Sequence, residues 1–124
     1  MTEGLTIQQA SKVSGVTPYT LRYYEKIGIL PNVPRNESGH RCYDEQDLGW
    51  IEWLKLLRST GMPIETIREF VELSQSDQDS ISARCAILDT HRQKLRTRID
   101  ELQGYLAKLD QKVQFYQGLE EQNL

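Results

Sequence analysis

The sequence contains no run of apolar residues that approaches the length of a membrane span, and its first residues show no signal-peptide pattern. It has only two cysteines, Cys42 and Cys85, without any CxxC spacing, which argues against a disulfide framework and a structural zinc site. The sequence contains no paired carboxylates, catalytic triad or phosphate-binding glycine loop that would indicate an enzyme. We therefore expect a cytoplasmic protein with no catalytic site, cofactor or metal site and no membrane contact.

The excess of basic charge that is typical of nucleic-acid binders is also missing, because the net charge is −3. Residues 1–60 carry seven basic and seven acidic side chains, whereas residues 61–124 carry eight basic and eleven acidic ones. The negative charge therefore comes from the C-terminal half, and DNA binding by the N-terminal half is not excluded. Since affinity for DNA scales with the number of phosphate contacts, we expect a dimer to bind better than a monomer.

Two short helices with a tight connection are predicted near the N-terminus. Residues 7–14 carry apolar side chains at spacings of three, which is typical of one helix face, and Gly15 then ends the helix. Residues 17–28 (TPYTLRYYEKIG) form the next helix, with Thr17 as the N-cap and Gly28 at the C-terminal end. This order predicts a helix-turn-helix, whose second helix enters the major groove of DNA.

The second predicted helix has an apolar and a polar face. Leu21 and Tyr24 are three residues apart and can face inward, so that Arg22, Tyr23 and Lys26 face outward. A guanidinium, a phenol and an ammonium group on one side suit contacts to phosphates and to base edges. An ordinary amphipathic surface helix is the alternative interpretation.

A loop over residues 31–44 follows, with two prolines, two asparagines and a Ser-Gly turn. We expect residues 41–43 to return as a short strand that pairs with residues 29–30, which would make a wing beside the second helix. The candidate DNA-backbone contacts in this wing are Arg35, His40 and Arg41, and the loop offers Arg41 no obvious carboxylate partner.

Two further helices, residues 45–60 and a shorter one that begins at Pro63, complete a predicted DNA-binding domain over residues 1–75. A long helix over residues 80–120 follows, with apolar residues alternating at spacings of four and three. This pattern is typical of the seam of a two-stranded coiled coil and predicts a homodimer, although it does not fix register or direction. The predicted dimerisation residues are Ile81, Leu88, Leu95, Ile99, Leu102, Leu106, Leu109, Val113 and Tyr116.

Three stretches, TLRYYEKIGIL (20–30), SGHRCYDEQDL (38–48) and LRSTGMPIETIREF (57–70), resemble the MerR family of bacterial transcription regulators. The resemblance implies a mainly α fold, in which a winged helix-turn-helix domain is followed by a dimerisation helix that forms an antiparallel coiled coil. It also implies binding to a near-palindromic promoter spacer in double-stranded DNA, which the dimer distorts in response to a stress signal or small ligand so that RNA polymerase can engage. The candidate DNA-binding residues of the helix and the wing are Thr17, Tyr19, Thr20, Arg22, Tyr23, Lys26, Arg35, His40 and Arg41.

The two thiols are candidate effector sites, because the chain is similar to the members of the family that respond to aldehydes, other electrophiles or oxidants. Cys42 is flanked by Arg41, whose charge would favour the reactive thiolate. Cys85 lies where mercury sensors of the family carry one ligand, which leaves a metal-responsive regulator as an alternative. Soft metals need two or more thiolates, and no cysteine lies near the C-terminus.

Two alternatives outside regulation stay open. An architectural DNA-binding protein or recombination accessory factor would share the winged helix, but it would not require so long a dimer helix. An adaptor that uses only its coiled coil is the other alternative. The sequence does not identify the inducer, the operator, the regulated genes or the balance between activation and repression.

Overall fold

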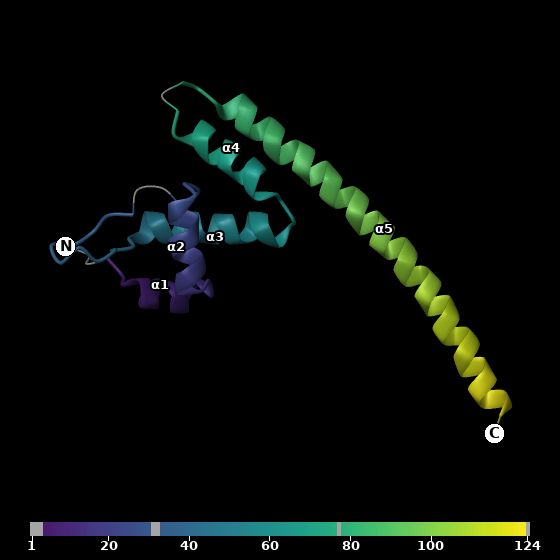
Figure 1. The fold of residues 1–124 in the computed structure, drawn as a ribbon. Coiled ribbons are helices and arrows are strands. Elements are labelled where there is room, and N and C mark those ends of the chain that lie inside the picture. Colours follow the sequence, from purple (N-terminus) through teal and green to yellow (C-terminus); the bar gives the residue numbers. More distant parts are fainter. Residues whose placement is uncertain (1–3, 31–32, 77, 124) are drawn as a thin grey trace. The chain divides into compact units, whose positions relative to one another are not determined.

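A computed structural model describes residues 4–30, 33–76 and 78–123, and shows the helical chain that the sequence predicts. The chain divides into two compact units, residues 1–84 and 85–124. The helices, shown in Figure 1, are α1 (Ile7–Ser14), α2 (Pro18–Lys26), α3 (Glu45–Ser59), α4 (Ile64–Ser74) and α5 (Ile81–Gln122).

The core of the first unit is formed where α1 packs against both α2 and α3, and α3 packs against α4. Leu21, predicted to face inward from α2, is fully buried, and Tyr24 is 9% exposed. Both inward predictions are therefore confirmed. The other buried apolar side chains are Ala10, Ile29, Leu30, Val33, Tyr43, Ile51, Leu54, Leu57, Met62, Ile67, Phe70 and Val71.

The turn between α1 and α2 is held by local and tertiary hydrogen bonds. Gly15 has a φ of +77°, a left-handed conformation that favours glycine, and its N–H donates to the Ser11 carbonyl over 2.8 Å. Lys55 reaches from α3 to the carbonyl of Ser14, with its Nζ 2.7 Å from the oxygen. The connection is therefore fixed to the core at the C-terminal end of α1, as a helix-turn-helix requires.

The prediction that residues 41–43 pair with residues 29–30 is wrong. Tyr43 instead forms an antiparallel bridge with Leu5, because the Leu5 N–H donates to the Tyr43 carbonyl over 2.7 Å and the Tyr43 N–H donates back over 2.9 Å. The backbone N–H groups of residues 29 and 30 donate to the Tyr24 carbonyl and so close the end of α2. Pro31, where the predicted loop begins, lies outside the described residues.

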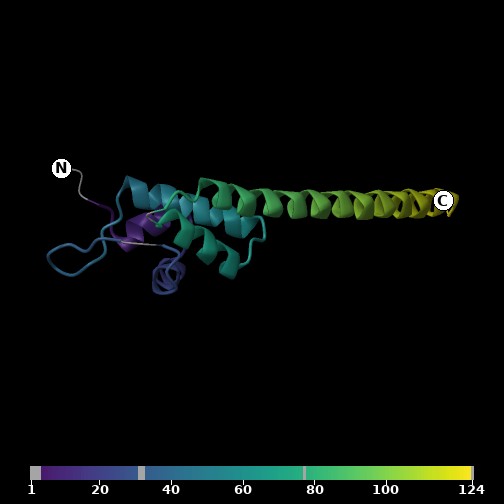
Figure 2. The same cartoon turned by 90° about the horizontal axis from the view of Figure 1, so that it is seen from above.

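The wing is a hairpin that closes on itself. Its two sides meet at an antiparallel bridge between Arg35 and Arg41, and the Cys42 N–H donates to the Pro34 carbonyl over 2.8 Å. Figure 2 shows residues 33–43 as a loop that extends away from the helices of the first unit.

The two tryptophans of α3, Trp50 and Trp53, are packing residues. Trp50 is half-buried and its indole N–H donates to the Ile29 carbonyl over 2.8 Å. Trp53 packs on Phe70 of α4, with ring centroids 6.0 Å apart. Both rings are therefore engaged within the first unit rather than presented to a ligand.

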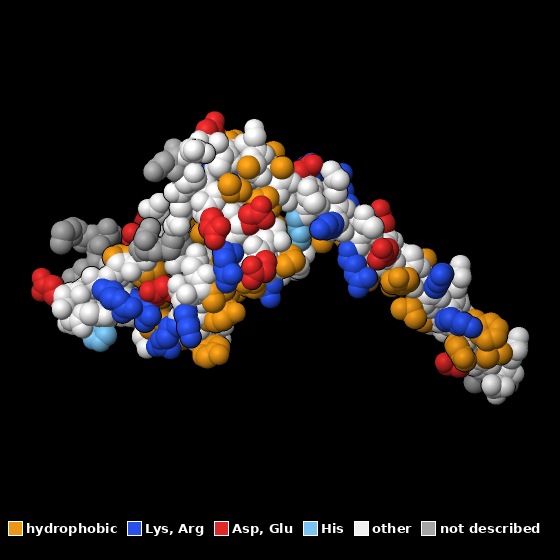
Figure 3. All heavy atoms as spheres, turned by 45° about the horizontal axis from the view of Figure 1, so that its top comes forward, with side chains coloured by type: hydrophobic (Ala, Val, Ile, Leu, Met, Phe, Trp, Pro, Cys, Tyr) orange, Lys and Arg blue, Asp and Glu red, His pale blue; other side chains and the backbone are white. Residues whose placement is uncertain are grey.

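Helix α5 begins at Ile81 and ends at Gln122, one residue after the predicted start and two residues after the predicted end. The Ser80 hydroxyl, just before the helix, donates to the Leu73 carbonyl over 2.7 Å. Among the described residues of α5 no side chain is fully buried. Hydrophobic side chains gather along its C-terminal part, as Figure 3 shows on one face. No helix within the described ranges has the length and apolarity needed to cross a membrane. Of the predicted dimerisation residues, Leu88 and Leu95 are half-buried, and Ile81, Ile99, Leu102, Leu106, Leu109, Val113 and Tyr116 are exposed.

Candidate nucleic-acid interface

The start of α2 is fixed by its N-cap. The Thr20 N–H donates to the Thr17 hydroxyl oxygen over 3.1 Å, and the Thr17 hydroxyl donates to the Thr20 hydroxyl oxygen over 2.9 Å. Pro18 occupies the first helical position, where its missing N–H costs no hydrogen bond. Both threonines of the predicted DNA-binding set are thus used to order the helix start, and Thr17 remains exposed there.

The outward face of α2 presents aromatic and basic side chains to solvent. Tyr19 is 78% exposed and Tyr23 is 44% exposed, although large aromatic side chains usually find apolar neighbours in a monomer. Arg22 and Lys26 are also exposed. The predicted orientation of this face is therefore confirmed, and its chemistry combines phosphate-binding cations with rings that can contact sugars and bases.

The C-terminal end of α2 is anchored to the rest of the first unit. Gly28 adopts a φ of +84° and turns the chain back toward the core. The guanidinium of Arg68, on α4, donates to the Ile27 carbonyl over 3.3 Å. The indole N–H of Trp50 donates to the Ile29 carbonyl. Because both ends of α2 are fixed, its outward face is a rigid surface, as groove recognition requires.

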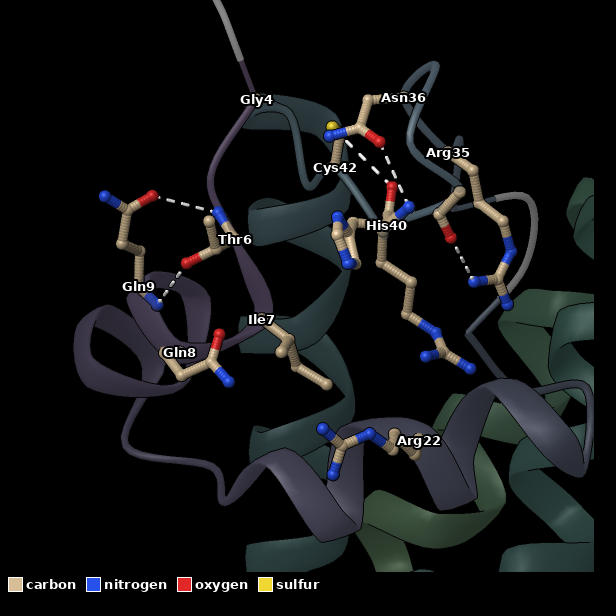
Figure 4. A pocket seen from close by; sticks show the side chains of 12 residues that line it. Gly4, Thr6, Ile7, Gln8, Gln9, Arg22, Arg35, Asn36, His40 and Cys42 are labelled. Atoms are coloured by element: carbon tan, nitrogen blue, oxygen red, sulfur yellow. Dashed lines mark hydrogen bonds between the residues drawn. The ribbon is translucent and has the colours of Figure 1, made fainter.

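The tip of the wing is organised by Asn36 (Figure 4). Its side-chain oxygen accepts hydrogen bonds from the N–H groups of Ser38 and His40, at 2.9 and 3.0 Å. Gly39 supplies the left-handed residue of the turn, with a φ of +80°. Arg35 donates from its guanidinium to the Gly39 carbonyl over 3.0 Å, so part of its hydrogen-bonding capacity is used inside the wing.

Arg41 has a carboxylate partner, contrary to the expectation from the loop sequence. Its Nε donates to a carboxylate oxygen of Glu25 on α2, and the side chains of this pair are only 24% and 22% exposed. Arg35 lies 3.8 Å from the other oxygen of Glu25, with its side chain 49% exposed. Glu25 therefore joins α2 to the wing, and the Arg41 side chain is less exposed than the Arg35 side chain.

An open cleft of about 830 Å³ lies between the start of α1, the middle of α2 and the wing. Figure 4 shows Arg22, Arg35, His40 and Cys42 around it, and Arg41 also lines it. The structure thus brings four predicted DNA-binding residues and one predicted thiol together. Tyr19, Tyr23 and Lys26 are not among the lining residues and belong to the outward face of α2.

Tyr43 is the buried support beneath the wing. Its ring is fully buried, and its hydroxyl has no hydrogen-bond partner among the residues that the structure describes. Burial raises the pKa of this hydroxyl above its usual value, the negative charge of Glu25 adds to the rise, and Arg41 opposes it. Tyr43 therefore stays neutral and contributes to the wing by packing and by its backbone pairing with Leu5.

The two thiols occupy different surroundings. Cys42 is half-buried in the wing and its Sγ lies 3.9 Å from the His40 carbonyl. The backbone of Gly4 passes so close that an added Cβ would lie 2.9 Å from the Cβ of Cys42. Cys85 is exposed on α5, with Leu88 and Arg92 lining the same shallow pocket. Within the described ranges, no group of three or more His, Cys, Asp or Glu side chains is placed to hold a metal ion.

Sequence reasoning did not identify Glu25 or Asn36 as organisers of this surface. Glu25 follows the buried Leu21 by one helical turn, and that spacing is the signal that its carboxylate lies beside the buried face and needs a partner. Asn36 precedes a Ser-Gly turn, a position where an asparagine side chain commonly accepts bonds from the next backbone N–H groups. Both signals were available in the sequence.

The fold and this surface agree with the similarity to known proteins. Residues 5–73 match the family described as MerR HTH family regulatory protein, and residues 48–112 match the family described as MerR, DNA binding. The HTH-type transcriptional regulator AdhR of Bacillus subtilis (strain 168) is 43% identical over 91 residues, which cover 73% of this chain and 65% of AdhR.

Solved structures show the same architecture. One is the crystal structure of a protein from Listeria monocytogenes that is assigned to the MerR family of transcriptional regulators. Its sequence is 39% identical, the match covers 90% of this chain and 85% of the Listeria chain, and the TM-score is 0.86. A second solved structure is that of HiNmlR, a MerR family regulator that lacks the sensor domain and was crystallised bound to promoter DNA. It is 37% identical to this chain, the match covers 92% of this chain and 90% of the HiNmlR chain, and the TM-score is 0.85. Sequence and structure together show that the chain belongs to the MerR family of helix-turn-helix regulatory proteins.

Proposed function

We propose that this protein is a transcriptional regulator that binds a near-palindromic promoter spacer as a homodimer and distorts it in response to a signal, so that RNA polymerase can engage. The observation that carries the proposal is the outward face of α2. It exposes Tyr19 and Tyr23 beside Arg22 and Lys26 on a helix that is fixed at both ends. We assign this face to the major groove and the wing to the backbone beside it.

The proposed homodimer is supported by α5, which carries a line of exposed apolar side chains over more than four turns. Two copies would bring two α2 helices to one duplex, so that inverted half-sites match the two-fold axis of the protein. A dimer also doubles the phosphate contacts, which compensates for the negative net charge of the chain. This role needs no catalytic group, and we expect the protein to act in the cytoplasm, where its DNA lies.

The test is a binding experiment with a defined duplex. A 30-base-pair duplex is selected from a randomised pool with the full chain, and its affinity is measured by fluorescence anisotropy at several salt concentrations. We expect Arg22→Ala to weaken binding about 5- to 150-fold, because an arginine in the groove contributes about 1–3 kcal/mol. The matched control is Lys108→Ala on α5, which removes one cation outside the proposed interface and leaves the affinity unchanged.

Two outcomes would count against the proposal. Equal losses for Arg22→Ala and Lys108→Ala would mean that binding depends on total charge rather than on α2. Failure to enrich any duplex would contradict sequence-specific binding. Occupancy of many genomic sites of unrelated sequence would instead favour an architectural role, and occupancy of one or a few promoters supports the regulator.

We also propose Cys42, rather than Cys85, as the thiol through which an electrophile would alter DNA binding. Cys42 lines the cleft that Arg22 and Arg41 share, so a group attached to its sulfur would occupy the proposed DNA surface. The test compares DNA affinity before and after treatment with an alkylating reagent. We expect the wild-type protein and Cys85→Ser to lose affinity and Cys42→Ser to keep it, and a loss in Cys42→Ser would reject this assignment.

A further inference from the structure

Three guanidinium groups meet at the cleft between α1, α2 and the wing. Arg22 comes from α2, Arg35 and Arg41 come from the wing, and no aspartate or glutamate is among the described residues that line the cleft. Attraction to any duplex, whatever its sequence, grows with the number of cations that reach its phosphates. Because a regulator competes with the many nonspecific sites of a genome, cations that bind any phosphate reduce its discrimination.

A single carboxylate on α2 contacts both arginines of the wing. One oxygen of Glu25 accepts a hydrogen bond from the Nε of Arg41, and the other lies 3.8 Å from a guanidinium nitrogen of Arg35. The Arg35 guanidinium also donates to the Gly39 carbonyl over 3.0 Å. Glu25 is the only acidic residue of α2. The helix that carries the proposed base contacts therefore also restrains the cations of the wing.

We propose that Glu25 is a specificity-determining residue, which withholds Arg41 from the phosphates of unrelated DNA and fixes the wing in register with α2. The proposal rests on the DNA binding proposed above and adds how that surface rejects other sequences. An exchange of the carboxylate for a phosphate is unfavourable for Arg41. It would leave Glu25, whose side chain is 22% exposed, without its counter-charge and beside the negative DNA backbone. The exposed Arg35 and His40 are left as the phosphate contacts of the wing.

A purely structural role of the same ion pair predicts a different outcome. If Glu25 only supported the wing, its loss would weaken binding to every duplex and would add no new contact. The proposal instead predicts that unrelated DNA is bound more tightly without Glu25 and with a steeper dependence on salt, because the released Arg41 adds a phosphate contact. The salt dependence of binding to unrelated DNA therefore distinguishes the two roles.

The test measures the affinity of the full chain for two duplexes by fluorescence anisotropy, between about 50 and 200 mM salt. One is the selected duplex, and the other is an unrelated duplex of the same length and base composition. For Glu25→Gln on the unrelated duplex, we expect the slope of log K against log salt concentration to steepen by about 0.9 per protomer, because one more phosphate is neutralised. We also expect the ratio of the two affinities to fall severalfold, since the wing is no longer fixed to α2.

Two control variants separate the release of Arg41 from a simple change of charge. Glu37→Gln removes one negative charge from the same wing, at an exposed side chain, and should leave the slope on the unrelated duplex unchanged. The double variant Glu25→Gln, Arg41→Gln has the net charge of the wild type and lacks the released cation. Its slope should return to the wild-type value, whereas the ratio of affinities should stay low because the wing remains unlinked.

Three outcomes would overturn the proposal. They are an unchanged or shallower slope in Glu25→Gln, an equal steepening in Glu37→Gln, and a ratio of affinities that does not fall in Glu25→Gln. A wild-type chain that binds both duplexes equally well would instead reject the sequence-specific binding on which the proposal rests.

A second measurement uses the wild-type protein and does not depend on the stability of Glu25→Gln. The Nε–H resonance of Arg41 is followed by NMR in protein with ¹⁵N-labelled arginine and is assigned by its loss in Arg41→Lys. We expect its chemical shift in the complex with the unrelated duplex to match that of the free protein, because Glu25 remains its partner. A different chemical shift in that complex would show that Arg41 has left Glu25 and would also overturn the proposal.

Discussion

Removing the carboxylate of Glu25 should destabilise the first unit, because this group holds the wing to α2. Its pair with Arg41 has side chains that are 22% and 24% exposed, so most of each is shielded from water. A hydrogen bond to a charged group contributes about 1.5–3 kcal/mol, whereas a fully exposed ion pair contributes about 0.2–1 kcal/mol. We expect Glu25→Gln to lower the free energy of unfolding by about 1.5–3 kcal/mol, since it removes the charge and keeps the shape.

The assay is urea unfolding at a fixed protein concentration, followed by the fluorescence of the two tryptophans of α3. Arg41→Gln and the double variant complete a thermodynamic cycle, in which the two losses should be clearly less than additive. Glu52→Gln, at an exposed glutamate of α3, is the control and should change the free energy by less than about 0.5 kcal/mol. Additive losses, or a Glu25→Gln variant as stable as the control, would refute the assignment of Glu25 as the link between helix and wing.

Three further predictions concern the stability of the first unit. Leu21→Ala should cost about 2–5 kcal/mol in urea unfolding because Leu21 is fully buried, and Val13→Ala, at a side chain that is 65% exposed, should cost less than about 0.5 kcal/mol. Thr6→Ala removes the N-cap of α1 and should cost about 1 kcal/mol, measured in the same way. The stability of the wild-type protein should fall as the pH rises above about 10, because an unfolded tyrosine ionises there while the raised pKa of Tyr43 keeps the folded state protonated. Tyr43→Phe should make the decrease in unfolding free energy above about pH 10 smaller. The same pH dependence in Tyr43→Phe as in the wild type would contradict the role assigned to Tyr43.

The helices were predictable because their signals are local. Thr17 and Gly28 mark the ends of α2 within one dozen residues, and the spacing of Leu21 and Tyr24 identifies its buried face. The same reasoning applies to α5, whose start at Ile81 and apolar repeat are properties of one continuous segment. The outward face of α2 follows once its buried face is known.

The wing was predicted with the wrong partner because its pairing is not local. Tyr43 pairs with Leu5, near the N-terminal end of the domain, and a segment of three residues has too little alternation to specify its register. The link between Arg41 and Glu25 likewise joins residues sixteen positions apart on different elements. Inspection of the loop alone could not supply that carboxylate, because it comes from the preceding helix.

The most direct test of the central claim, that α2 presents the DNA-binding face, is hydroxyl-radical footprinting of the tyrosines by mass spectrometry. Tyr19 and Tyr23 are exposed in the free protein, whereas Tyr105 is exposed on α5 and serves as the internal control. In a complex saturated with the selected duplex, the account predicts that oxidation of Tyr19 and Tyr23 slows severalfold while oxidation of Tyr105 is unchanged relative to the DNA-free dimer. Unchanged oxidation of Tyr19 and Tyr23 in that complex would contradict it.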